Sequence, residues 1–284
     1  MKLTFLGTAA SEGYPNAFCN CLNCERARQL GGPSLRKRSA VLVNADLLID
    51  LGPDLMAAAQ AHGVSLAGLR YCVQTHEHAD HLDPSHLASR SSHCGVHGVP
   101  RLHLYTTRGG MEKAGSALGL RLPGDGPVEL DAGEALNLTF HQIGPFQEFA
   151  VGPYHVHSVL ATHDPKLTPL LHVVEQAGRS LFYGTDTGPL SEATWAALST
   201  AGHRFNVVVL DHTFGLRERS GGHMNQEQFL ETADRLRAEG LLADDARIFA
   251  QHFGHHSNPD HSELVALAAK WGYEIPYDGL VVNV

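Results

Sequence analysis

The sequence predicts an α/β protein with two mixed β-sheets and helices on their outer faces. The chain has 284 residues, of which 43% are hydrophobic and 18% charged, so it can bury a substantial core and is not globally disordered. Short segments rich in aliphatic and β-branched residues recur between Gly, Asp and Pro. In the second half these segments alternate with helical ones, and no linker interrupts them. We therefore expect a single domain over residues 1–284.

The predicted strands and helices follow from these local patterns. Strands are expected at residues 2–6, 40–43, 47–50, 70–74, 102–105, 154–161, 170–175, 180–183, 207–210 and 248–250. Helices are expected at residues 53–62, 109–118, 191–201, 225–239 and 260–271. The fourth helix has the clearest start, because Asn225 can cap it and Gln228 follows three residues later, as in a capping box. Phe229, Ala233 and Leu236 then share one face.

The net charge of the chain limits the classes of partner that we expect it to bind. A formal net charge of -9 disfavours a general duplex-binding protein, although residues 36–38 form a local basic cluster. Apolar runs such as residues 207–210 are too short to span a membrane. Residues 1–10 read as a first strand rather than a leader peptide. We expect a cytoplasmic protein that acts on a small molecule and binds neither membranes nor nucleic acids.

Histidine and cysteine are the informative residue types. The chain has 20 His against 21 Lys and Arg, and neutral imidazole is the commonest metal ligand in proteins. Three of the five Cys lie together as Cys19, Cys21 and Cys24, which favours a metal site over disulfides in a chain without a leader. Cys72 and Cys94 are interpreted as small buried apolar residues.

The strongest motif is Thr75-His-Glu-His-Ala-Asp-His81, directly after the predicted strand at residues 70–74. A turn there can direct His76 and His78 to one side and Asp80 and His81 to the other. Four ligand-type residues in six positions can therefore begin two adjacent metal sites. The pattern His-x-His-x-Asp-His resembles the signature of the metallo-β-lactamase superfamily. That resemblance implies an αββα sandwich fold with two mixed sheets and outer helices.

The resemblance also implies where the remaining ligands lie. His163 follows one predicted strand, Asp186 follows another, and His252 follows a third, as residues of loop-built sites on a rigid scaffold do. The family's division places His76, His78 and His163 on one metal. It places Asp80, His81 and His252 on the other metal, with Asp186 bridging. Mixed nitrogen and oxygen ligation suits Zn²⁺, Mn²⁺ or Fe²⁺.

The segment at residues 19–24 predicts an N-terminal zinc-binding Cys loop. A closed zinc site needs four ligands, and from the residues alone Cys72 or a His can supply the fourth. Phe5-Leu-Gly-Thr-Ala-Ala10, the Cys cluster and Arg38-Ser-Ala40 together resemble the family of phosphoribosyl 1,2-cyclic phosphate phosphodiesterases of the carbon–phosphorus lyase pathway. This resemblance implies a structural zinc on Cys19, Cys21, Cys24 and His255, with His256 as a competing fourth ligand.

The same resemblance implies the catalytic and substrate-binding residues. His223, in a Gly-rich loop before a helix, and Asp80 are the expected catalytic residues. Lys166 is the expected ligand of a second substrate phosphate, and Arg36 and Arg38 are weaker candidates. The chain is longer than is usual in that family, with extra sequence around residues 124–149 and 214–220.

The predicted function is therefore dinuclear-metal-dependent hydrolysis of a small cyclic phosphodiester such as 5-phosphoribosyl 1,2-cyclic phosphate. Two alternatives stay open. One is a cofactor-pathway protein resembling pyrroloquinoline quinone biosynthesis protein B, which generally lacks a full dinuclear ligand set. The other is an RNA-processing nuclease resembling transfer RNA 3′-end ribonuclease, which needs a basic docking arm that this sequence lacks. Related enzymes often form dimers, so a homodimer is also an expectation.

Overall fold

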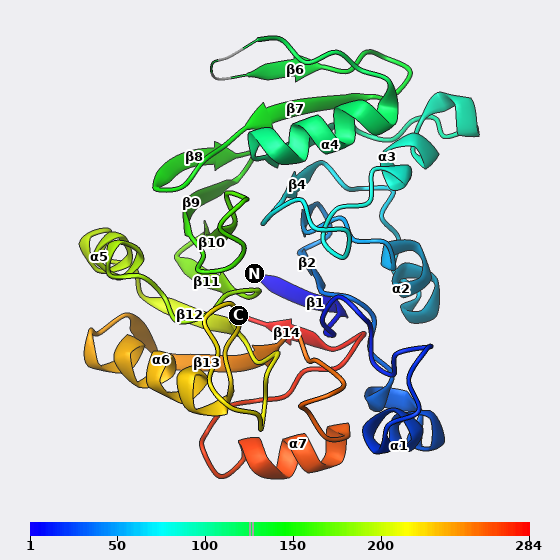
Figure 1. Ribbon diagram of the computed structural model, residues 1–284. Coiled ribbons are helices and arrows are strands. Elements are labelled where there is room, and N and C mark those ends of the chain that lie inside the picture. The colour runs from blue at the N-terminus through cyan, green and yellow to red at the C-terminus, as the bar shows by residue number, and fades with distance from the viewer. Residues whose placement is uncertain (125, 127) are drawn as a thin grey trace.

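The computed structural model describes residues 1–124, 126 and 128–284 as two β-sheets packed between two layers of helices (Figure 1). Asp125 and Pro127, in the extra segment around residues 124–149, lie outside the described residues. The strands are β1 (Lys2–Gly7), β2 (Ala40–Val43), β3 (Leu47–Ile49), β4 (Tyr71–Val73), β5 (Leu102–Thr106), β6 (Glu129–Asp131), β7 (Leu138–Gln142), β8 (Gln147–Val151), β9 (Tyr154–Leu160), β10 (Leu170–Gln176), β11 (Arg179–Gly184), β12 (Phe205–Asp211), β13 (Leu242–Gln251) and β14 (Val281–Asn283). The helices are α1 (Leu22–Leu30), α2 (Leu55–His62), α3 (Ser85–Ser89), α4 (Arg108–Leu118), α5 (Glu192–Thr200), α6 (Gln226–Ala238) and α7 (His261–Ala268).

Both sheets are mixed. The first, here called the N-terminal sheet, has the order β14-β1-β2-β3-β4-β5-β7-β6, and its central strands β3, β4, β5 and β7 run parallel. The second, the C-terminal sheet, has the order β13-β12-β11-β10-β9-β8, and β11, β12 and β13 run parallel. Parallel neighbours bring their carboxyl ends to the same edge of a sheet, where ligand sites are commonly built.

Alternating side chains join the four layers. Phe5, Val41 and Ile49 of the N-terminal sheet belong to the core shared with the C-terminal sheet. Their neighbours Leu6 and Leu42 point the other way, toward α2 and α4. This period of two is what a sheet buried on both faces requires. Figure 1 shows α2, α3 and α4 on one side of the two sheets and α5 and α6 on the other.

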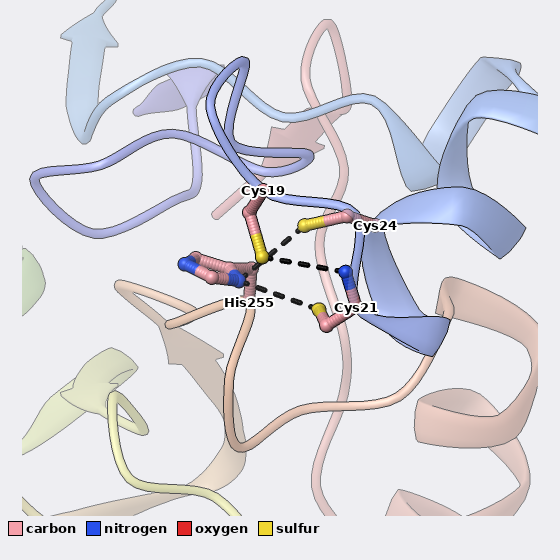
Figure 2. A group of neighbouring side chains, drawn as sticks. All are labelled: Cys19, Cys21, Cys24 and His255. Carbon is pink, nitrogen blue, oxygen red and sulfur yellow. Dashed lines mark hydrogen bonds between the residues drawn. The ribbon is translucent and has the colours of Figure 1, made fainter.

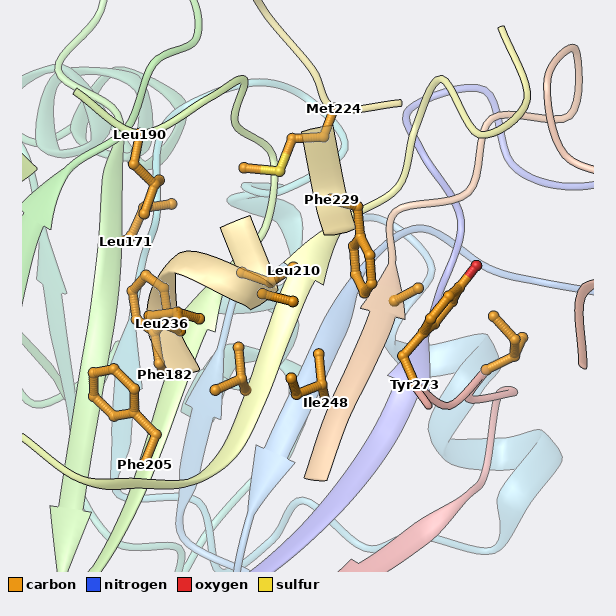
Figure 3. Packing of buried hydrophobic residues seen from close by; sticks show 14 of the residues in the cluster. Leu171, Phe182, Leu190, Phe205, Leu210, Met224, Phe229, Leu236, Ile248 and Tyr273 are labelled. Carbon is orange, nitrogen blue, oxygen red and sulfur yellow. The ribbon is translucent and has the colours of Figure 1, made fainter. Parts of the chain in front are cut away.

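The outer face of the C-terminal sheet carries the largest cluster of buried apolar residues. Phe229 and Leu236 of α6 pack over Phe182 and Leu210 of the strands (Figure 3). The helix begins as the sequence predicts, because Asn225 and Gln228 form a complete capping box. The predicted class, with two mixed sheets and outer helices, is confirmed.

All the predicted strands and helices are present, with ends shifted by a few residues. The prediction missed α1, α3 and the strands β6, β7, β8 and β14. It also treated residues 19–24 as one tight loop. In the structure the loop ends at Cys21, the N-cap of α1, and Cys24 lies within the first turn of that helix. Among the described residues, no helix combines the length and apolar character that crossing a bilayer demands.

A buried arginine ties the first strands to the C-terminal segment. Arg36 is only 4% exposed and donates hydrogen bonds to Thr8 Oγ1 and the Pro276 carbonyl, both at 2.7 Å, and to His261 Nδ1 at 2.9 Å. Its guanidinium also lies 4.4 Å from the centre of the Phe253 ring. The weaker expectation that Arg36 binds substrate phosphate is therefore wrong, because its charge is occupied inside the fold.

Asp278 lies in the same buried region. Its carboxylate accepts hydrogen bonds from Thr8 Oγ1 at 2.8 Å and from the Lys37 amide at 2.6 Å. Burial nevertheless raises the pKa of Asp278 from 3.8 to about 6, since the carboxylate is removed from water. The folded protein thus holds this proton more tightly than the unfolded chain does.

A pH dependence follows from this shift. The stabilising effect of the protonated carboxyl is fully present below about pH 4 and is lost as the pH rises through about 6. Relative to Asp278→Asn, the free energy of unfolding of the wild type should therefore fall by up to about 3 kcal/mol over that range. Urea unfolding at several pH values measures the difference. The exposed Asp244 provides the control variant Asp244→Asn. Parallel curves for wild type and Asp278→Asn would contradict the prediction.

Candidate metal centre

The predicted ligands lie in loops at the carboxyl ends of strands. His76, His78, Asp80 and His81 follow β4, while the loops after β9, β11 and β13 carry the other three predicted ligands. Asp186 and His252 both have positive φ, 59° and 64°. Such backbone is rare for residues other than glycine and clusters at functional sites. The two sheets therefore bring seven residues from distant parts of the chain to one edge.

The first group contains His76, His78, His163 and Asp186, with one ligand-type atom of each within 4.8 Å of the others. His78 Nδ1 lies 2.9 Å from His76 Nε2 and 3.2 Å from His163 Nε2. His76 Nε2 lies 3.3 Å from Asp186 Oδ2. This is the set of residues expected around the first metal.

The second group contains Asp80, His81, Asp186 and His252, all buried. His81 Nε2 lies 3.2 Å from Asp80 Oδ2 and 3.0 Å from Asp186 Oδ2. His252 Nε2 lies 3.6 Å from the same oxygen of each carboxylate. Asp186 therefore belongs to both groups, in the position expected of a bridging ligand.

These distances fit a bound divalent ion. Ligand nitrogen and oxygen atoms about 2.0–2.1 Å from a tetrahedral zinc are about 3.3 Å apart, and the two groups fall around this value. In addition, His81 Nε2, His252 Nε2 and Asp186 Oδ1 are buried without a hydrogen-bond partner among the described residues. Buried polar atoms left unpaired cost about 1–3 kcal/mol each, which a metal ligand would recover.

The other nitrogen of each histidine faces an oxygen. His76 Nδ1 lies 3.0 Å from Thr75 Oγ1. His81 Nδ1 lies 2.7 Å from Asp50 Oδ2, and His252 Nδ1 lies 2.8 Å from Thr213 Oγ1. His163 Nδ1 faces the Gly222 carbonyl at 3.2 Å, and His78 Nε2 lies 3.5 Å from Asp164 Oδ2. Such partners fix the tautomer and the ring orientation of a metal ligand.

Asp50 organises the motif loop and was missed from the sequence. Besides holding His81, its carboxylate accepts hydrogen bonds from the amide and hydroxyl of Thr75 and from Gln74 Nε2, at 2.8–3.0 Å. Asp50 directly follows β3 and has a φ of 67°. A lone carboxylate at the end of the apolar strand Leu47–Ile49 was the available signal, since unpaired acids are rarely placed inside a core.

Burial and charge set the protonation of the site. Burial lowers the pKa of His76 to about 4, so that ring is neutral, as a metal ligand must be. Burial opposes the ionisation of Asp80 and Asp186, but the neighbouring rings of His81 and His252 outweigh it and hold both carboxyl pKa values well below the usual range. Conversely, these carboxylates raise the pKa of His81 and His252 against the effect of burial. Asp80 and Asp186 are thus ionised and attract cations, either protons on the neighbouring rings or metal ions.

His223 reaches the centre from the loop before α6. Its Nδ1 lies 3.1 Å from Asp186 Oδ1 and 3.3 Å from Asp211 Oδ2. Asp211 also accepts hydrogen bonds from the Met224 amide at 3.0 Å and from Thr213 Oγ1 at 2.8 Å, so it fixes this loop. A side chain at Gly188 would meet the Gly221 carbonyl at 2.0 Å. Glycine at 188 therefore lets the loop approach Asp186 closely.

A cavity of about 230 Å³ opens over both groups. It is lined by Ala10, Ser11, Glu12, His78, Asp80, His163, Asp186, Thr213, Phe214, His223, His252 and His256. Phe214 belongs to the extra segment 214–220, which therefore meets the site. Lys166 is exposed and is not among the residues that line this cavity. The structure thus gives no contact for the predicted role of Lys166 in binding a substrate phosphate.

The cysteine cluster forms a separate group, shown in Figure 2. His255 Nδ1 lies 3.3 Å from Cys24 Sγ and 3.7 Å from Cys21 Sγ, and Cys19 completes the set. Zinc–ligand lengths of about 2.3 Å for sulfur and 2.0 Å for nitrogen place such atoms about 3.5 Å apart at a tetrahedral ion, so the four residues fit Zn²⁺. Burial opposes the thiolate of Cys21, but the Cys24 amide and His255 lower its pKa to about 6.

The competing fourth ligand, His256, faces elsewhere. Its Nδ1 lies 3.2 Å from Glu12 Oε1, and it lines the cavity over the metal centre. Cys72 is buried and distant in the fold, on β4 of the N-terminal sheet. His255 therefore stands as the fourth residue of the cysteine group, three positions after His252 of the metal centre.

Comparisons with known proteins agree with this geometry. The Beta-lactamase superfamily domain matches residues 46–243. A diphosphatase from the PhnP family superposes with a TM-score of 0.74 at 20% identity, covering 99% of this chain and 96% of that one. Zn²⁺-bound PqqB from Methylobacterium extorquens gives 0.71 at 18% identity, covering all of both chains, and the short form of human tRNase Z gives 0.64 at 15%, covering 100% and 99%. No curated protein matches the sequence.

The expected superfamily and fold are confirmed by the domain match, which spans the motif loop, His163, Asp186 and His223. The expectation of a metal-dependent hydrolase agrees with this superfamily match and with the two groups of potential metal ligands. Identities of 20% and below extend the likeness to the fold and leave the substrate to be tested.

The cysteine group generates a test by substitution. Cys21→Ser should lose about one zinc per chain, because a hydroxyl replaces a thiolate ligand. It should lower Tm by roughly 5–15 °C, since the metal would fasten the loop before α1 to the segment after β13. Elemental analysis and calorimetry measure both effects. Cys94→Ser is the matched control, because Cys94 is exposed and the expectation that it is buried is wrong. Full zinc content in Cys21→Ser would contradict the assignment.

Proposed function

The chain belongs to the β-lactamase superfamily, and on that premise we propose that it is a metal-dependent phosphodiesterase. Its substrate is a small cyclic phosphodiester such as 5-phosphoribosyl 1,2-cyclic phosphate. The observation that carries the proposal is the pair of four-residue groups that share Asp186 beneath one small cavity. Two adjacent cation sites suit a phosphodiester, whose charge grows on several oxygens in the transition state.

Different residues of the site would have different roles in such a reaction. Divalent ions held by the two groups supply Lewis acidity toward phosphoryl oxygens and a water that is acidic near neutral pH. Asp186 keeps the two groups adjacent, and Asp50 and Thr213 hold the rings of His81 and His252 in place. Because Asp211 accepts a hydrogen bond from Nδ1 of His223, which also lies 3.1 Å from Asp186 Oδ1, Nε2 of His223 is the ring atom left to give a proton to the leaving oxygen.

Two other functions are weighed against this one. A cofactor-pathway role like that of pyrroloquinoline quinone biosynthesis protein B is supported by similar architecture. The complete second group of Asp80, His81, Asp186 and His252 favours hydrolysis over that role. A nuclease role is supported by the likeness to tRNase Z, but a net charge of -9 and a cavity of about 230 Å³ favour a small substrate.

Turnover of 5-phosphoribosyl 1,2-cyclic phosphate by Mn²⁺-loaded protein tests the proposal. His78→Ala should lower kcat/KM by at least about a thousandfold, because it removes a ligand that orients the metal centre. His97→Ala, at an exposed site, should leave the rate unchanged. Cleavage of aryl phosphodiesters alone would support the phosphodiesterase activity but show that 5-phosphoribosyl 1,2-cyclic phosphate is not the substrate. Failure to cleave either diester would overturn the proposal in favour of the cofactor-pathway role.

His223 yields a second test of the same proposal. His223→Gln retains a side-chain amide that can reach Asp186 but cannot transfer a proton at neutral pH. We expect kcat to fall about 10²–10⁴-fold while KM and metal content stay at wild-type values. Arg219→Ala, an exposed position on the same loop, controls for loop disturbance. His223 also lies within reach of a ligand set with Asp211 and His252, so parallel loss of metal and activity would make it a ligand instead.

A further inference from the structure

A second cavity, of about 410 Å³, adjoins the one over the metal centre. Its lining consists of Ser11, Arg38, Pro53, Ala79, Asp80, Leu82, Asp83, Pro84 and Lys113. Ser11 and Asp80 line both cavities, so the two spaces share a wall. The second space is therefore adjacent to the position that a substrate over the metal groups would occupy. The proposed hydrolysis makes no other use of it.

Lys113 brings a held ammonium group to this cavity. It lies on α4 and donates a hydrogen bond to the Glu77 carbonyl at 2.7 Å. Helix α4 packs closely on the motif loop, because a side chain at Gly109 would meet Glu77 Oε1 at 1.9 Å. The position of Lys113 relative to the metal ligands is thus fixed by the fold. An ammonium has three donors, so two remain for a ligand.

Arg38 supplies a second held cation. Its Nε donates to the Ser11 carbonyl at 2.9 Å, and its Nη1 donates to Asp54 Oδ1 at 3.1 Å. Asp54 also accepts a hydrogen bond from the Arg38 amide at 3.0 Å, which fixes both ends of the residue. Within the described part of the chain, Nη2 has no hydrogen-bond partner. Because Nε and Nη1 of Arg38 already donate hydrogen bonds, Nη2 is the nitrogen that can donate to a bound anion.

The acidic residues at this cavity leave the donors of Lys113 and Arg38 available to an anionic ligand once the metal centre is filled. Two lining residues are acidic, Asp80 and Asp83. Asp80 faces His81 and His252 as a member of the second metal group, so a metal would neutralise it. Asp83 accepts a hydrogen bond from the Ser85 amide at 2.9 Å and can also accept one from a sugar hydroxyl. Asp54, which pairs with Arg38, and Asp83 then balance the charges of Arg38 and Lys113, so an anion is bound here through the free N–H donors of Nζ and Nη2 rather than through surplus charge.

We propose that Lys113 and Arg38 bind a second, non-reacting phosphate of the substrate in this cavity. The inference rests on the proposed phosphodiesterase function and narrows its substrate class to phosphorylated sugars whose cyclic diester lies over the metals. It replaces Lys166, which is exposed, with a pair of cations fixed by contacts to Glu77, Ser11 and Asp54. These residues set specificity, whereas the metal centre performs the chemistry.

Paired substrates test the inference. Lys113→Met and Arg38→Gln should each lower kcat/KM for 5-phosphoribosyl 1,2-cyclic phosphate about ten- to hundredfold, mainly through KM, because each loses a charged hydrogen bond. The same variants should cleave ribosyl 1,2-cyclic phosphate, which lacks the 5-phosphate, within about twofold of the wild-type rate. Lys270→Met, an exposed position at the end of α7, is the control. Equal effects on both substrates, or none, would overturn the inference.

A binding measurement separates this inference from the proposed function. Calorimetric titration with ribose 5-phosphate and with ribose requires no turnover, and metal content is measured in each sample. Weaker binding of ribose 5-phosphate to Lys113→Met at unchanged metal content supports the second phosphate site, even if the cyclic diester is never cleaved. Cleavage of the diester with unchanged binding of ribose 5-phosphate in both variants would retain the phosphodiesterase and reject the site.

Discussion

The candidate site depends on one buried carboxylate. Asp186 is 3% exposed and lies within 3.0–3.6 Å of nitrogens on His76, His81, His163, His223 and His252. No other residue in the described chain belongs to both groups of predicted metal ligands. A single anion that faces five imidazole rings is held by their partial or full positive charge. Its position in turn determines how far apart those five rings lie. Its left-handed backbone, with φ at 59°, is the local strain that this position imposes.

The two sheets surround that carboxylate with loops from both sides. The loop after β4 approaches from the N-terminal sheet, and the loops after β9, β11 and β13 approach from the C-terminal sheet. The shared core of Phe5, Val41 and their partners holds the two sheets at a fixed separation. Bound metals would add ligand bonds across the same seam. Apolar packing and metal coordination would therefore both stabilise the contact between the N-terminal and C-terminal sheets.

The sequence predicts the fold class from local patterns and the first four ligands from one motif, and the resemblance that this motif carries implies the remaining three. His76 to His81 form a dense motif after an apolar strand, and Asp186 and His252 also come directly after strands. Asp50 has only its place after an apolar strand as a signal and Lys113 has none, since their roles arise from contacts with residues 25 and 36 positions away. Lys166 was favoured for its nearness to His163 along the chain, but the loop leaves it exposed. The edge strand β6 is short and mostly polar, and β8 buries only Val151, so hydrophobic patterning misses both strands.

The wide spacing of the seven candidate ligands also governs when a metal can enter. They span residues 76 to 252, and the last of them follows β13, which pairs with β12 only after most of the chain has been made. No fragment that ends before β13 contains both complete groups. Full coordination of both groups therefore requires the chain through His252, whereas the first group is complete by Asp186.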